Sequence, residues 1–215
     1  MDARPHSKNM GAMMTDSGVT PSNQGPNLML DRANPPASLR QLMATAVFDD
    51  IPELAEDMET RPTRTETGPQ FAQRLLQCPA PEEAVTFLAQ LFTRRVAVWW
   101  GHECLRVIGT PLDPADTRMM ALVADWVAAP NETNRQQVID AVAASDRRSP
   151  GVWLAMATGW TGGSLAPPES SPVPVPRFLT GRGVNAAVLS ALARVPRKDR
   201  HKTLETFVAM AHDLI

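Results

Sequence analysis

The sequence lacks the motifs by which metal, redox and nucleotide sites are usually recognised. Its two cysteines, Cys78 and Cys104, form no CxxC pair, and its four histidines belong to no HExxH motif. Zinc sites need such clustered ligands. A Walker glycine loop and a dinucleotide fingerprint are also missing. We therefore expect no metal ion and no cofactor.

Long apolar runs and a strong charge bias are missing too. No window approaches the roughly 20 apolar residues of a membrane span, and no apolar run of the length of a secretory signal follows Met1. The net charge is −2, whereas phosphate binding by a whole domain needs a basic excess. We expect a soluble cytoplasmic protein with reduced thiols and no nucleic-acid partner.

Aromatic residues are few, and their distribution predicts where the core lies. They make up 5% of the chain, tyrosine is missing, and all five tryptophans lie between Trp99 and Trp160. The composition, 43% hydrophobic and 20% charged, is typical of a globular protein. A domain of roughly 150 residues buries about 70% of its unfolded surface, so a core centred on the tryptophans is expected.

Residues 1–36 are rich in Pro, Asn, Ser, Gly and Met and show no periodicity. Such a stretch buries too little apolar area to offset its chain entropy, so we predict a disordered tail. Residues 37–68 are expected to hold a short helix, an acidic segment and a linker.

The short helix is predicted over residues 39–48. Ser38 would be its N-cap, and its apolar face would carry Leu39, Leu42, Met43 and Ala46. The acidic stretch that follows contains no basic residue between positions 49 and 59.

From residue 69 onward the apolar spacing is helical throughout. We predict helices over residues 69–77, 82–92, 94–108 and 114–128, helices after caps at Asn131, Ser149 and Thr180, and a last helix over residues 197–214. No segment of useful length alternates with period two, so a sheet is not expected. Short loops between helices of 10 to 16 residues favour an all-α domain over residues 69–215, an irregular antiparallel helical bundle.

Glycine and proline residues indicate where predicted helices end and how the segments between them are built. Gly162-Gly163 would end the helix that carries Trp153 and Trp160, because glycine accepts the left-handed conformation. The five prolines of residues 167–176 predict a rigid, extended connection. Ser164 lacks the second glycine of a GxSxG motif and a preceding strand, so we interpret it as part of a turn.

His102 and Cys104 are the most reactive side chains that lie close together in the sequence. A thiolate nucleophile needs a base within hydrogen-bond reach, but residues two apart on a helix point to nearly opposite sides. We interpret Cys104 as a buried packing residue and expect no catalytic residue. A small enzyme that uses Cys104 or His102 in a buried pocket stays as the alternative.

The tryptophans supply candidate partner-binding residues. Core packing explains most of them, but Trp99 and Trp100 lie about 100° apart on a helix and cannot face the same way. Because Trp is enriched in binding hot spots, Trp100 and Trp160 are candidates for an interface. Leu39, Leu42 and Met43 join them, since the predicted acidic helix could fold on binding.

A basic cluster precedes and opens the last predicted helix. Its members are Arg194, Arg197, Lys198, Arg200 and Lys202, interrupted by Asp199. Cations are unfavourable at a helix N-terminus, so the cluster is a candidate site for an acidic partner, a nucleic acid, an anionic lipid, or the acidic residues 49–59 of the same chain. The interpretation that we favour is a solvated charged surface.

Four segments resemble an uncharacterised family of bacterial proteins. They are Val96-Ala97-Val98-Trp99-Trp100, Val152-Trp153-Leu154-Ala155-Met156-Ala157, Trp160-Thr161-Gly162-Gly163-Ser164-Leu165-Ala166-Pro167-Pro168 and Leu179-Thr180-Gly181-Arg182-Gly183-Val184. The resemblance covers roughly residues 69–215 and implies a helical protein without assigned enzymatic activity. Many such proteins are encoded near type VI secretion components, which implies an accessory role. Gly101-His102 depart from the small apolar residues expected after the Trp pair, so Trp100 would pack differently here.

Together these observations favour a non-enzymatic interaction or adaptor protein. The resemblance implies an accessory factor of a bacterial type VI secretion system, with a secretion component as its protein partner.

Overall fold

A computed structural model describes residues 38–108, 113–166 and 169–215. Over these residues the chain forms ten α-helices and one 3-10 turn, and its only extended pairings are isolated bridges. The predicted all-α class is confirmed. The tail predicted for residues 1–36 lies outside the described part of the chain. None of the described helices is long and apolar enough to cross a membrane.

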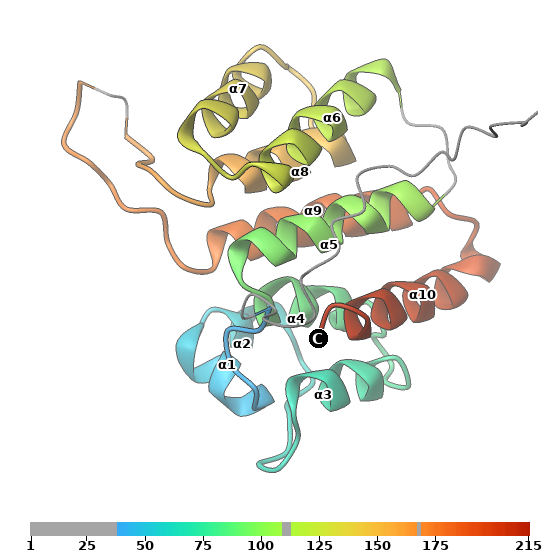
Figure 1. Cartoon of the computed structure of the whole chain (residues 1–215). Helices are drawn as coiled ribbons and strands as arrows, with labels where there is room; N and C mark the ends of the chain where they lie inside the picture. Colours follow the sequence, from blue (N-terminus) through green and yellow to red (C-terminus); the bar gives the residue numbers. More distant parts are fainter. Residues whose placement is uncertain (1–37, 109–112, 167–168) are drawn as a thin grey trace, which may run out of the picture.

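The helices lie in three tiers (Figure 1). α6 (Pro114–Ala128), α7 (Glu132–Ala143) and α8 (Pro150–Gly159) form the upper tier. α5 (Arg94–Val107) and α9 (Leu179–Leu192) run side by side through the middle. The lower tier holds α1 (Ala44–Asp50), α2 (Leu54–Asp57), α3 (Gly68–Leu75), α4 (Glu83–Leu91) and α10 (Arg200–His212).

The first helix starts later than predicted. α1 begins at Ala44, with Met43 as its N-cap, so the helical face assigned to Leu39, Leu42 and Met43 is wrong. Leu39 and Met43 instead form antiparallel bridges with Phe92 and Thr67. Leu42 is 63% exposed. Backbone pairing with distant segments outweighs the local helical tendency of residues 39–43.

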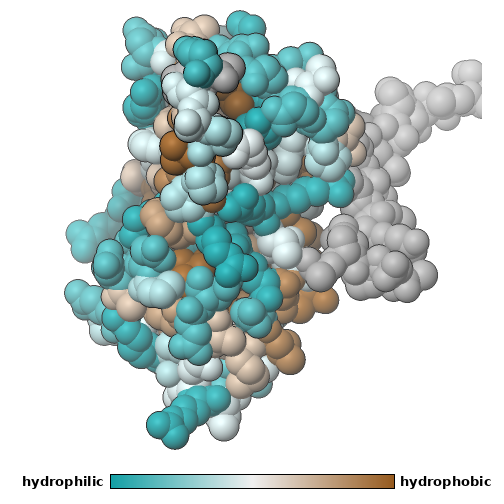
Figure 2. All heavy atoms as spheres, turned by 90° about the vertical axis from the view of Figure 1, so that its left-hand side faces the viewer, coloured by the Kyte–Doolittle hydropathy of each residue, from teal (hydrophilic) through white to brown (hydrophobic). Residues whose placement is uncertain are grey.

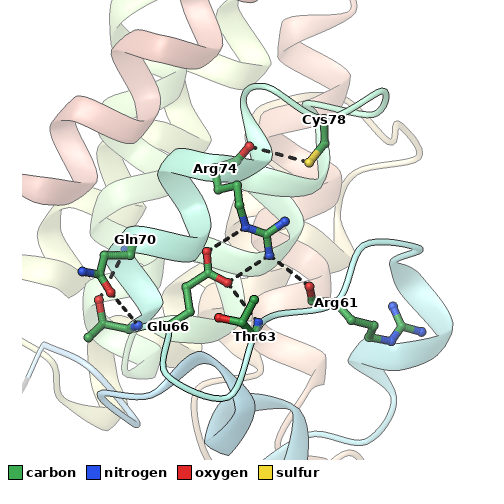
Figure 3. A network of polar contacts seen from close by, with 7 residues as sticks. Arg61, Thr63, Glu66, Gln70, Arg74 and Cys78 are labelled. Atoms are coloured by element: carbon green, nitrogen blue, oxygen red, sulfur yellow. Dashed lines mark hydrogen bonds and ion pairs between the residues drawn. The ribbon is translucent and has the colours of Figure 1, made fainter.

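The segment predicted as a linker is held firmly against α3. Thr67 and Gln70 form a capping box at the start of this helix. The Arg74 guanidinium binds both carboxylate oxygens of Glu66, at 2.7 and 2.9 Å, and donates to the carbonyl of Arg61 (Figure 3). Residues 61–67 are therefore part of the folded domain.

α4 is the central helix of the lower tier. All nine of its residues are buried, and its Phe87 ring packs edge-on against Phe71 of α3 with centroids 4.8 Å apart. Phe48 of α1 lies beside both rings. The apolar side chains of α1 and α2, including Val47 and Leu54, are also buried in this core.

Close helix packing joins the middle and upper tiers. Gly183 of α9 faces α8, and a Cβ atom there would lie 2.8 Å from the Cβ of Ala157. α9 begins at Leu179 rather than after a Thr180 cap. The Thr180 hydroxyl instead donates to the carbonyl of Trp160 at 2.8 Å. This contact fixes the end of α8 to the start of α9.

Candidate functional site

An apolar hollow of about 260 Å³ opens between α7 and α8, and we call it the α7–α8 groove. α7 contributes Ile139 and Val142, and α8 contributes Met156 and Trp160. Leu165, from the turn that follows α8, forms the remaining apolar wall. The volume lies just below the roughly 300–1,000 Å³ of small-molecule pockets, so the groove suits a few aliphatic side chains.

Arg135 is the cation of the groove, and its guanidinium is already engaged. It donates to the carbonyl of Gly159 at 2.8 Å and forms a two-point ion pair with Glu132. The hydrogen bond from Arg135 holds the pKa of Glu132 below its ordinary value. Gly163, at φ 72°, lies against this guanidinium. Arg135 therefore braces the turn more than it attracts a ligand.

The proline-rich connection beside the groove, which we call the strap, covers residues 162–166 and 169–178. Its two arms pair at the Ser164–Pro174 bridge, and the Leu165 amide donates to the Val173 carbonyl at 2.9 Å. The Ser164 hydroxyl oxygen accepts from the amides of Ala166 and Val173. Ser164 is thus committed to turn structure, as its sequence context predicted.

Arg94 of α5 closes the base of the strap. Its guanidinium donates to the carbonyls of Thr161 and Val175, at 3.0 and 3.2 Å. Burial, followed by the charge of Arg177, lowers the pKa of Arg94 from its ordinary value. The strap projects away from the three tiers beyond this clamp (Figure 1).

Apolar side chains are exposed on the strap. Leu165 is 44% and Val173 48% exposed, and the two residues are paired across the arms. On the side from which the strap projects, small apolar areas show among polar residues at the height of the upper tier (Figure 2). The groove and these two side chains together make an apolar surface with a polar rim, the anatomy of a protein-binding patch.

The structure places the two tryptophan candidates in different environments. Trp160 lines the groove and is half-buried, so the structure keeps it as a candidate. Trp100 is fully buried, and its indole Nε1 donates to the Phe207 carbonyl at 3.0 Å. This removes Trp100 from the partner-binding residues. Its half-buried neighbour Trp99 stacks on the His102 ring, with centroids 5.6 Å apart.

The geometry does not support a nucleophile at Cys104. The side chain is fully buried, and burial, reinforced by the charge of Glu103, raises the pKa of the thiol well above its ordinary value. A protonated thiol is a poor nucleophile. His102 contacts Glu103 instead, with 3.0 Å between Nδ1 and Oε1. Among the described residues, no three His, Cys, Asp or Glu side chains gather as a metal site would require.

The basic cluster divides into residues with different roles. Arg200 donates to the carbonyls of Val195 and Ala193, at 3.0 and 2.7 Å, and so caps the end of α9. Arg194 lies 3.6 Å from the buried carboxylate of Asp116. Arg194 is itself exposed, as are the other three members of the cluster, Arg197, Lys198 and Lys202.

The acidic residues 49–59 do not lie on this cluster. Asp50 pairs with Arg177, and Asp57 binds Arg182 at 2.8 and 3.0 Å. Burial of α1 and α2 in the lower tier places Asp50 and Asp57 at the start of α9, whereas the basic cluster begins just beyond the end of this helix. Intramolecular docking of this segment onto the basic cluster is therefore wrong for this fold.

Sequence reasoning missed most of the groove. Arg135 and Ile139 were not singled out, and Leu165 appeared only within a segment that carries the resemblance. The available signal was the Gly-Gly-Ser-Leu turn directly after a Trp-bearing helix. This sequence signal could not show that α7 faces the turn.

Residues 71–215 match a family of unknown function, DUF6931. The chain belongs to this family. The match contains the groove and the strap, fits the resemblance to an uncharacterised family over nearly the same residues, and leaves α1 and α2 outside the matched range. No curated protein and no solved structure matches the chain at a significant level.

Proposed function

We propose that this member of DUF6931 is a non-enzymatic interaction protein that binds an apolar segment of a partner in its α7–α8 groove. The observation that carries the proposal is the combination of a small apolar hollow with the exposed Leu165 and Val173 beside it. Anchoring side chains seated in such a pocket and shielded by a rim typically dominate binding energy.

An adaptor role fits the rest of the site better than catalysis. The groove has apolar walls, and its guanidinium is already paired with Glu132. The hydroxyl of Ser164 accepts hydrogen bonds from two backbone amides. Cys104, the candidate nucleophile, lies fully buried in the core. A reaction needs a nucleophile or an acid–base pair that can reach its substrate.

The proposed partner is a component of a bacterial type VI secretion system. This part rests on the sequence resemblance and its genomic association, because fold and family alone do not establish function. The chemistry of the groove adds that the contacting segment carries aliphatic or methionine side chains.

The test is affinity purification from cells that carry the secretion genes. We expect the unaltered protein to recover a secretion component, and the double variant Leu165→Asp/Val173→Asp to recover at least tenfold less. Val107→Asp is the matched control, since Val107 is 42% exposed on α5, away from the strap. The proposal fails if no secretion component is recovered, or if the double variant recovers as much as the control.

A further inference from the structure

We propose that Leu28-Met29-Leu30 of this same chain occupies the α7–α8 groove until the partner displaces it. The inference rests on the proposed binding function of the groove. It adds a competing ligand, carried within the protein, that sets how readily the partner is bound.

The described chain begins at Ser38, beside the start of α5. The carbonyl of Ser38 accepts a hydrogen bond from the amide of Thr93 at 2.8 Å. The next residue, Arg94, reaches the carbonyl of Thr161 at 3.0 Å. Thr161 directly follows Trp160, which lines the groove. Two hydrogen-bonded contacts thus connect residue 38 to Thr161, the residue that follows Trp160 of the groove wall.

The tether between Leu30 and Ser38 sets how far the apolar run can extend from the described chain. Eight peptide units separate Leu30 from Ser38, and at full extension they span about 26 Å. A tether of this length holds the segment at an effective concentration of roughly millimolar, so even weak affinity fills the groove.

The apolar run at residues 28–30 matches the chemistry of the groove walls. Residues 1–37 contain two runs of three apolar residues, Ala12-Met13-Met14 and Leu28-Met29-Leu30. The second run has bulkier side chains and lies closer to Ser38, where the described chain begins. Its aliphatic side chains match the walls formed by Ile139, Met156 and Leu165. Methionine adapts well to irregular apolar surfaces.

The experiment uses the full chain of 215 residues with a photo-reactive benzoylphenylalanine in place of Leu165. Irradiation should cross-link this position within one chain to the tryptic peptide of residues 9–32, with fragment ions that place the bond at residues 28–30. The same label in place of Gln136, exposed on α7, should not give this product.

Matched variants identify the segment. Leu28→Ser/Leu30→Ser should reduce the cross-link at least fivefold, whereas Met13→Ser/Met14→Ser should leave it unchanged. Loss in the second variant instead of the first would overturn the assignment. A product joining two chains would show that a second copy, not this segment, occupies the groove, and absence of any product would also overturn the proposal.

Partner recovery separates this proposal from the binding function on which it rests. Leu28→Ser/Leu30→Ser should raise recovery of the secretion component at least threefold. If Leu165→Asp/Val173→Asp abolishes recovery while the variant at residues 28 and 30 changes neither recovery nor cross-linking, the groove binds a partner and the internal ligand is refuted. If none of these variants changes recovery, both proposals fail.

Discussion

Gly163 shows how one residue fixes the shape of the groove. Its φ of 72° lies in the left-handed region, which costs an L-residue roughly 1–2 kcal/mol. A Cβ atom there would also collide with the guanidinium of Arg135, which Glu132 and Gly159 hold in place. Both effects act on the turn that carries Leu165.

The first prediction compares two adjacent glycines. Gly163→Ala should lower the free energy of unfolding by about 2 kcal/mol, from backbone strain and displacement of Arg135. Gly162→Ala should change it by less than about 0.5 kcal/mol, because a Cβ at Gly162 meets no atom within 4 Å. Urea unfolding followed by tryptophan fluorescence measures both values. Equal effects in the two variants would contradict the role given to the turn.

Trp100 illustrates the residue-scale limit of sequence prediction. Helical spacing showed that Trp99 and Trp100 face different ways, but not which of them faces the core. That depends on Phe207, whose carbonyl accepts the Trp100 indole hydrogen. The partner lies 107 positions further along the chain, so no local pattern reveals it.

At the scale of elements, Asp116 joins three helices at one end of the upper tier. It lies in the first turn of α6, is fully buried, and its Oδ1 accepts from the Gly151 amide of α8 at 2.8 Å. The Ser149 hydroxyl donates to the same oxygen. Arg194, just beyond α9, lies 3.6 Å from Oδ2.

The second prediction is that Asp116→Ala lowers the free energy of unfolding by about 3 kcal/mol. The change leaves the buried Gly151 amide without its acceptor, at about 1–3 kcal/mol, and removes the hydrogen bond from the half-buried Ser149 hydroxyl, worth about 0.5–1.5 kcal/mol. Asp125→Ala, at an exposed position on the same helix, is the control and should stay within about 0.5 kcal/mol. Chemical denaturation measures the free energy of unfolding of both variants. If Asp116→Ala loses no more stability than Asp125→Ala, Asp116 does not link the helices.

Helix boundaries were predictable where the signals are local. Asp113 caps α6 through the Asp116 amide, and Pro114 opens the helix as predicted. Asn131 likewise caps α7. The start of α1 was not predictable, because Leu39 and Met43 pair with Phe92 and Thr67. The groove was missed for the same reason, since it depends on how α7 packs against the turn after α8.

At the scale of the whole molecule, carboxylates paired in the fold tie its stability to pH. The hydrogen bond from Arg74, the largest cause, holds the pKa of Glu66 below its ordinary value of 4.5. For Glu103, burial opposes ionisation, but hydrogen bonds from His102 and Arg106 outweigh it and lower the pKa. Carboxylates with depressed pKa values stabilise the fold while ionised and lose this contribution on protonation.

The third prediction concerns how stability changes on acidification, because the depressed pKa of Glu66 makes its ionised form stabilising. The free energy of unfolding should be steady between about pH 5 and 8 and should fall as the pH drops below 4.5, the ordinary pKa of Glu66, towards its lower folded value. Glu66→Gln should be less stable at pH 7 and should lose less on acidification. Glu82→Gln, exposed just before α4, is the control. Parallel pH profiles for the two variants would contradict the contribution of Glu66.

The clamp at Arg94 determines how the strap would tolerate a change in its length. One guanidinium bridges Thr161, just before the strap, and Val175 in its second arm, so this loop is closed near its base. Doubling the length of a flexible loop then adds only about 0.6 kcal/mol of entropic penalty. Lengthening the tip should therefore disturb the helices below far less than removing the Arg94 guanidinium, which would release both arms of the strap at once.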